Sequence, residues 1–240
     1  MRFDGRNPTQ LRPLAIDLSP VRYPEGSALI RMGDTHVLCA VTVEQSVPRW
    51  RQGSGKGWLT AEYALLPRST HTRTPRNHIE GGRAQEIRRL IGRSLRRAVA
   101  LDLLGERTLL VDCDVLQADG GTRAASISGG YVAVALAMQT MIAEALILPE
   151  TLLPPIAAIS VGLVKGEALV DLAYQEDAAA QVDLNVVLDA EGGFIEVQGT
   201  AEGEPISRAV LNELLDISVP GARGVVRAQR EVLACAGIKV

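Results

Sequence analysis

The sequence predicts a mixed α/β (α+β) fold made of two similar halves, in which sheets are covered on one side by helices. Short apolar runs typical of strands alternate along the chain with longer patterns typical of helices. Glycine and proline turns separate these runs, and no low-complexity linker divides the chain. With 240 residues, of which 47% are hydrophobic and 22% charged, the chain can bury a core without disulfides or metals. We therefore expect a single domain over residues 1–240.

The first half is predicted to begin with a hairpin. Two apolar runs are separated by Gly33 and Asp34, a pair typical of a tight turn. Two more strands follow, one on each side of a helical pattern. The strands expected in this half cover residues 27–31, 35–44, 58–66 and 108–117.

The helix between the third and fourth of these strands is predicted over residues 83–104. Its apolar face carries Ile87, Ile91, Leu95 and Ala98. Arg89, Arg93 and Arg97 lie four apart on another face, where like charges are slightly destabilising. We expect a counter-anion there, either nucleic-acid phosphate or an acidic surface of a neighbouring subunit. A solvated face is the alternative.

Positive charge gathers around this helix. Nine arginines and only two acidic residues lie between positions 68 and 97, although the net charge of the whole chain is −3. Arginine can bind phosphate or carboxylate through two parallel N–H groups. Residues 67–76 are polar and broken by prolines, so we predict an exposed loop that carries Arg68, Arg73 and Arg76.

One apolar segment is long enough to cross a membrane. Residues 124–143 carry no charged side chain. The segment is nevertheless rich in alanine, contains Ser126, Ser128 and two adjacent glycines, and has no second segment like it. We therefore expect a buried helix and no association with a membrane.

The cysteines and the first residues indicate a cytoplasmic protein. The first residues contain no apolar run typical of a secretory signal. Cys39, Cys113 and Cys235 are odd in number and lack a metal-binding spacing. Reduced thiols are therefore expected, rather than a disulfide framework or a zinc site.

The second half is predicted to contain four strands and a final helix. The expected strands cover residues 156–164, 168–173, 183–189 and 194–200. Lys165 and Gly166 form the expected turn between the first two. The helix is expected to begin near Pro205, and its buried stripe is predicted at Ile206, Val210, Leu214 and Ile217.

A glycine turn between a strand and a helix, Gly120-Gly121-Thr122-Arg123, is the strongest local signal for a bound ligand. Glycines let the backbone approach a ligand, and a helix N-terminus offers free N–H groups and partial positive charge. Thr122 adds a hydroxyl group and Arg123 adds a full charge. A second Gly-Gly-Arg run ends at Arg83 and also begins a helix, so both could converge on one phosphate. Simple capping of the two helices is the alternative.

Two carboxylates form a further candidate site. Asp177 and Asp183 flank a short connection between predicted elements, so they could face one pocket. Two carboxylates beside a phosphate site can hold a divalent metal or deliver a proton to a leaving oxygen. The alternative is that these residues are acidic side chains of a turn and have no functional role.

With these residues in view, the sequence resembles the bacterial ribonuclease PH family over nearly its whole length. The matching segments are RFDGR (2–6), GWLTAEY (57–63), LPR (66–68), EIRRLIGRSLR (86–96), DCDVLQADGGTR (112–123), YQED (174–177) and VDLN (182–185). The resemblance implies a two-half fold with an unusual left-handed β-α-β crossover. It also implies a homohexamer assembled as a trimer of dimers.

The resemblance implies a phosphorolytic 3′-to-5′ exoribonuclease, or tRNA nucleotidyltransferase. Such an enzyme trims the 3′ ends of transfer RNA with inorganic phosphate and releases nucleoside diphosphates; the reverse reaction adds nucleotides. By position, the phosphate-binding residues would be Arg83, Gly121, Thr122 and Arg123. The catalytic carboxylates, with Mg²⁺ as the expected metal, would be Asp177 and Asp183. The RNA-binding loop would use Arg68, Arg73 and Arg76.

Two other classes of function remain open at this point. A non-catalytic RNA-binding subunit of a ring would keep the arginines and lose the carboxylates, but Asp177 and Asp183 are both present. A metal-dependent hydrolytic nuclease would use water and release monophosphates. It would be expected to show more clustered carboxylates and would need no pocket for free phosphate.

Overall fold

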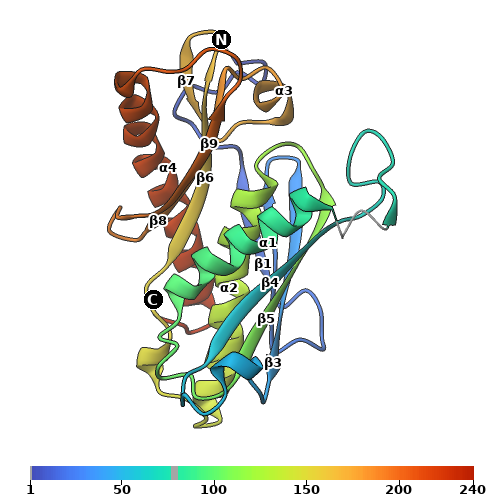
Figure 1. The fold of residues 1–240 in the computed structure, drawn as a ribbon, viewed down its shortest axis with the longest axis vertical. Coiled ribbons are helices and arrows are strands. Elements are labelled where there is room, and N and C mark those ends of the chain that lie inside the picture. Colours follow the sequence, from blue (N-terminus) through green and yellow to red (C-terminus); the bar gives the residue numbers. More distant parts are fainter. Residues whose placement is uncertain (1, 77–80) are drawn as a thin grey trace.

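The first half of the chain forms a five-stranded sheet. The computed structural model describes residues 2–76 and 81–240 (Figure 1). The strands of this sheet are β1 (Leu14–Leu18), β2 (Gly26–Met32), β3 (Thr35–Glu44), β4 (Trp58–Leu65) and β5 (Thr108–Gln117). Their order across the sheet is β1-β2-β3-β5-β4. Among the described strands of this sheet, only β4 and β5 pair in parallel. They are joined through helix α1 (Gly82–Leu95), so these three elements form a β-α-β unit.

The second half forms a four-stranded antiparallel sheet. Its strands are β6 (Ile156–Val164), β7 (Glu167–Val170), β8 (Val182–Asp189) and β9 (Phe194–Ala201), in the order β7-β6-β8-β9. The α-helices in the described part of the chain are α1 (Gly82–Leu95), α2 (Thr122–Ala143), α3 (Tyr174–Asp177) and α4 (Arg208–Cys235). The predicted fold class, two sheets with covering helices, is confirmed.

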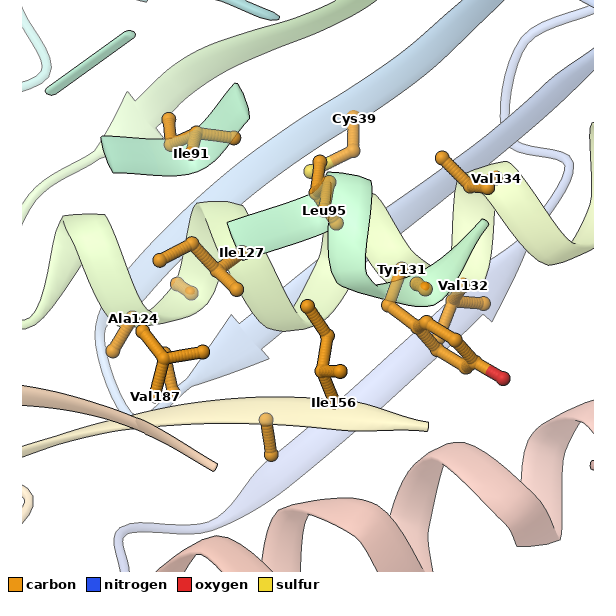
Figure 2. Packing of buried hydrophobic residues seen from close by; sticks show 14 of the residues in the cluster. Cys39, Ile91, Leu95, Ala124, Ile127, Tyr131, Val132, Val134, Ile156 and Val187 are labelled. Carbon is orange, nitrogen blue, oxygen red and sulfur yellow. The ribbon is translucent and has the colours of Figure 1, made fainter. Parts of the chain in front are cut away.

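Helix α2 lies between the two sheets. It packs against β2 and β3 on one side and against β6 on the other, while α4 covers β6 (Figure 1). Figure 2 shows Ile127 and Tyr131 of α2 together with Leu95 of α1 and Ile156 of β6. Residues of both sheets belong to the same buried apolar cluster, so the halves share one core.

The apolar length of α2 is explained by this position. The helix is long and apolar enough to cross a membrane, but 78% of its most apolar stretch is buried inside the protein. Gly129 is needed for the close contact between α2 and β2, because a Cβ at this position would lie 2.7 Å from Ile30 Cγ2. The prediction of a buried core helix is confirmed.

The structure corrects the predicted end of the first helix. Helix α1 ends at Leu95, and only a short 3-10 turn, Arg96–Ala98, continues it. The backbone beyond this point bonds to other segments instead. The N–H of Ala100 donates to Thr151 O at 2.9 Å, and the N–H of Leu153 donates to Ala98 O at 2.9 Å. Tertiary hydrogen bonds therefore replace the helical ones that the periodicity predicted.

Smaller differences occur in the second half and at the N-terminus. Strand β7 ends at Val170, because Asp171 has a positive φ of 56° and leaves the strand. Ser207 caps α4 by accepting a hydrogen bond from the N–H of Val210, so Ile206 lies outside the helix. Strand β1 was not predicted from the sequence.

Candidate active site

One cavity brings together the glycine-arginine runs and the pair of aspartates singled out in the sequence. It has a volume of about 380 Å³ and opens between α1, the start of α2, α3 and β8. The residues expected to bind phosphate or act in catalysis that line it are Arg83, Gly121, Thr122, Arg123, Asp177 and Asp183. These six residues come from four elements, so the fold gathers them although they are scattered along the chain.

The start of α2 forms one wall of this cavity. Gly120 and Gly121 have φ values of 74° and 65°, in the left-handed region that favours glycine. A Cβ on Gly120 would lie 2.7 Å from Leu172 O and 2.8 Å from Tyr174 N. Glycine therefore allows the segment that leads into α3 to approach the turn. The first N–H groups of α2 have no partners within the helix and are available to an anion.

Arg123 is held at the cavity from the side of α1. Its Nη2 lies 3.5 Å from Glu86 Oε1, and that oxygen also accepts a hydrogen bond from Gln198 Nε2 at 2.7 Å. Arg123 Nε is buried and has no hydrogen-bond partner among the residues that the structure describes. An oxyanion in the cavity would supply that partner. On the same wall, Thr122 Oγ1 lies 2.9 Å from Tyr63 Oη.

The two aspartates form a second wall of this cavity. Burial raises the pKa of Asp177, although the positive charges of Arg123 and Arg83 oppose this. Burial, together with the negative charge of Asp177, raises the pKa of Asp183 to about 6. Asp183 Oδ1 is buried without a hydrogen-bond partner in the described part of the chain. This oxygen is therefore open to a proton, a cation or a substrate group.

A buried network that sequence reasoning missed supports the aspartate wall. Arg2 binds Glu176, the residue before Asp177, through two hydrogen bonds of 2.7 and 2.6 Å. Arg12 binds Asp171 and also donates from Nη1 to Asp119 O at 2.5 Å. The N-terminal segment runs beside β7 and α3 and so braces both walls (Figure 1). More than 100 positions separate the partners, so no local pattern could reveal them.

The loop formed by residues 67–76, here called the arginine loop, lines the cavity with residues other than its arginines. The loop residues that line the cavity are Thr70, His71, Thr72 and Thr74. Arg68, Arg73 and Arg76 are exposed and are not among the lining residues. Arg68 Nη1 donates to His71 O at 2.9 Å, so Arg68 stabilises the loop itself.

Part of the positive charge on α1 is balanced within the chain. Arg93 pairs with Glu196 of β9, so an external counter-anion, as expected from the sequence, is not needed there. Arg88 pairs with Glu62 of β4 at 2.8 Å. Arg89 and Arg97 are exposed. At Arg93 the expected external anion is therefore replaced by a glutamate of the second half of the chain, which the fold brings next to α1.

The chemistry of the cavity is that of an anion site facing two carboxylates. Among residues 2–76 and 81–240, no group of three or more His, Cys, Asp or Glu side chains could hold a metal ion. All three cysteines are free, as predicted. A polyanion with its reactive phosphorus between the arginines and the aspartates would be complementary to this arrangement.

The family of the chain follows from comparison with known proteins. Residues 10–138 match domain 1 of the 3′ exoribonuclease family, and residues 154–220 match domain 2. The chain belongs to the 3′ exoribonuclease family. Within it, the chain is 52% identical to ribonuclease PH of Synechococcus sp. (strain CC9605), over 96% of this chain and 94% of that protein. It is also 52% identical to ribonuclease PH of Frankia casuarinae, over 97% and 94% of the two chains.

Solved structures share the fold at lower sequence identity. Rrp46 of rice (Oryza sativa) matches with a TM-score of 0.79 and 22% identity, over 97% of this chain and all of that one. The archaeal exosome core matches with a TM-score of 0.77 and 23% identity, over 95% and 90% of the two chains. The resemblance inferred from the sequence motifs is confirmed.

Proposed function

We propose that this chain is a phosphorolytic 3′-to-5′ exoribonuclease that trims the 3′ ends of transfer RNA. Inorganic phosphate is the co-substrate, nucleoside diphosphates are the products, and the reverse reaction adds nucleotides from nucleoside diphosphates. The observation that carries the proposal is that the start of α2, Arg83, Arg123, Asp177 and Asp183 all line one cavity. Membership of the 3′ exoribonuclease family and the ribonuclease PH relatives support it.

Phosphate would bind at the start of α2. The free N–H groups after Gly121, the hydroxyl group of Thr122 and the guanidinium groups of Arg83 and Arg123 all border this place. The unpartnered Nε of Arg123 supports a direct hydrogen bond to a phosphate oxygen. These groups offset the repulsion between free phosphate and the phosphodiester it attacks.

The reaction then needs a proton at the leaving oxygen. A phosphate oxygen forms a bond to the phosphorus of the last phosphodiester, and the bond to the 3′ oxygen of the preceding nucleotide breaks. The terminal nucleotide leaves as a diphosphate. Asp183 has a pKa of about 6, so near neutral pH a fraction of its carboxyl groups carries a proton for the 3′ oxygen.

As the alternative to proton donation by Asp183, the ionised carboxylates of Asp177 and Asp183 fit Mg²⁺. Mg²⁺ is bound in many phosphate sites by one or two carboxylates together with substrate phosphates. Asp177 and Asp183 would hold it, and the unpartnered Asp183 Oδ1 is a suitable hard oxygen ligand. When bound, the ion supplies positive charge that stabilises the developing negative charge on the reacting phosphate.

RNA binding and assembly complete the proposal. The exposed Arg73 and Arg76, with Arg68 bracing their loop, would contact the RNA backbone outside the cavity. We expect a homohexamer, a trimer of dimers, in the cytoplasm. Light scattering should give a mass about six times that of the 25.6 kDa chain. A monomer that degrades RNA at the full rate would show that the ring is not required.

Product analysis with and without phosphate tests the proposed reaction. With phosphate, a transfer RNA precursor should yield nucleoside diphosphates. Without phosphate, degradation should stop. Monophosphates released at the same rate in phosphate-free buffer would establish a hydrolytic nuclease instead. Binding of RNA with no products under either condition would establish the non-catalytic ring subunit.

A further inference from the structure

Two aromatic side chains stand at the cavity without a role in the proposed chemistry. Tyr174, the first residue of α3, and His71, from the arginine loop, both line the cavity. Their ring centroids are 5.8 Å apart and their planes are inclined by 51°. Tyr174 is 49% exposed, whereas Tyr63 and Tyr131 are buried in the core. Five of the eight Phe, Tyr and Trp side chains are exposed, and among these five only Tyr174 lines the cavity.

The backbone at each ring is held by a hydrogen bond, which is tertiary at Tyr174 and local at His71. The N–H of Tyr174 donates to Asp119 Oδ1 at 3.3 Å, and Gly120 allows that close approach. On the other side, His71 O accepts the hydrogen bond from Arg68 Nη1 at 2.9 Å. A backbone that is already held in place loses less conformational entropy when a ligand binds, so such an arrangement favours binding.

The two rings are tilted against each other and lie close in the chain to the proposed reaction centre. A tilt of 51° between planes means that the rings do not stack flat on each other. Tyr174 lies three residues before Asp177, one of the carboxylates at the proposed reaction centre. A nucleotide whose phosphate lies between Arg123 and Asp177 would have its base within the same cavity, which both rings line.

We propose that Tyr174 and His71 form a stacking site for the base of the 3′-terminal nucleotide of RNA. This inference rests on the proposed function, because it places the RNA 3′ end in this cavity. Stacking on aromatic rings is tolerant of sequence, since every base has a π-face. The site therefore recognises that a base is present without selecting which base, as an enzyme that removes successive nucleotides requires.

The test pairs a change in the protein with a change in the RNA. One oligoribonucleotide carries an ordinary 3′-terminal nucleotide, and its partner carries a ribose without a base at that position. Binding is measured by fluorescence anisotropy in phosphate-free buffer with EDTA, so that no turnover occurs. The variants are Tyr174→Ala, Tyr174→Phe and His71→Ala. Tyr23→Ala is the matched control, because Tyr23 is 91% exposed and does not line the cavity.

Stacking predicts a loss that depends on the base. Tyr174→Ala should weaken binding of the ordinary RNA by about 5- to 100-fold, the range for one lost base–aromatic stack. His71→Ala should cause a smaller loss, while Tyr174→Phe and Tyr23→Ala should bind like the unchanged protein. The RNA without a terminal base should bind more weakly to the unchanged protein, and Tyr174→Ala should weaken it no further.

Two outcomes would overturn the inference. One is an equal loss for both RNAs on Tyr174→Ala, which would mean that the residue supports the fold or the RNA backbone. The other is unchanged affinity for the ordinary RNA. Because binding is measured without phosphate, these outcomes are independent of whether the reaction is phosphorolytic, which only the product analysis decides. A thermal melt of each variant checks that it is folded.

Discussion

Arg12 and Asp171 form a buried ion pair, with Arg12 Nη2 2.6 Å from Asp171 Oδ1, although 159 positions separate them in the chain. Asp171 Oδ2 also accepts hydrogen bonds from the backbone N–H and from Nε of Arg12, at 2.7 and 3.1 Å. Because Arg12 reaches Asp119 O as well, the pair joins the end of β7 to the glycine turn of the cavity. The stability of the fold and the geometry of the candidate active site therefore depend on the same contact.

Breaking this pair should be costly. Arg12→Ala leaves the buried Asp171 carboxylate with only the more distant Arg6, whose Nη1 lies 3.6 Å from Asp171 Oδ2, so the free energy of unfolding should fall by about 3–5 kcal/mol. The double variant with Asp171→Ala should lose clearly less than the sum of the two single losses. Urea denaturation measures all three. Arg31→Ala is the matched control, because its pair with Asp17 is partly exposed and should contribute only about 0.2–1 kcal/mol. If the two single losses of unfolding free energy added up in the double variant, Arg12 and Asp171 would not be coupled.

The two cavity arginines should be needed for the rate. Arg83→Ala and Arg123→Ala should each lower phosphorolysis by about 10²–10³-fold, the scale for losing one preorganised charge-stabilising donor. Replacement by Lys should restore only part of the rate, because a point charge cannot form two parallel hydrogen bonds. Steady-state kinetics with varied phosphate measures the effect, with the exposed Arg227→Ala as control. Full activity of either Ala variant would remove that arginine from the site.

The carboxylates should be needed for turnover rather than for folding. Asp177→Asn and Asp183→Asn keep the side-chain volume and remove the charge, so both should abolish turnover while RNA affinity changes little. Turnover at saturating Mg²⁺ and binding in EDTA separate the two effects. Near-normal turnover of either variant would show that this aspartate has no catalytic role and is only part of the connection between α3 and β8.

Asp183 should also make stability depend on pH. Its folded pKa of about 6 lies above the ordinary value of 3.8, because burial disfavours the charged form. The stabilising contribution of the protonated group is complete below the unfolded pKa and is lost as the pH rises through 6. Asp183→Asn should therefore raise the free energy of unfolding by about 1–3 kcal/mol at pH 8 and change it little at pH 4. Denaturation at both pH values tests this, with the exposed Asp216→Asn as control. An equal change in the free energy of unfolding at pH 8 and pH 4 would contradict the raised pKa of Asp183.

The loop arginines should act on long RNA only. Arg73→Ala and Arg76→Ala should weaken binding of transfer RNA and reduce the slope of affinity against salt concentration by about one unit for each lost phosphate contact. Degradation of a very short oligonucleotide should hardly change, since neither arginine lines the cavity. Binding titrations over a salt series and a short-substrate assay measure both. If degradation of the short oligonucleotide fell as much as binding of transfer RNA, the loop arginines would act in catalysis or assembly.

Much of the fold was predictable because strand and turn signals are local. The sequence predicted strands over residues 35–44, 108–117 and 156–164, and the structure has the same bounds. A short apolar run and the turn residues that bound it are neighbours in the sequence, so a single sequence contains this signal. The glycine turn before α2 was recognisable for the same reason. The single domain expected over residues 1–240 stays a prediction.

Only the tertiary structure decided which distant groups meet. The end of α1 at Leu95, the pairing of Arg93 with Glu196, and the brace from Arg12 to Asp171 all depend on segments far away in the chain. The raised pKa of Asp183 likewise arises from burial and from Asp177, which the fold brings near. The sequence by itself determined the local elements and the kinds of side chain available for chemistry. Packing determined their partners, because the burial and pairing of a charge depend on every segment that surrounds it.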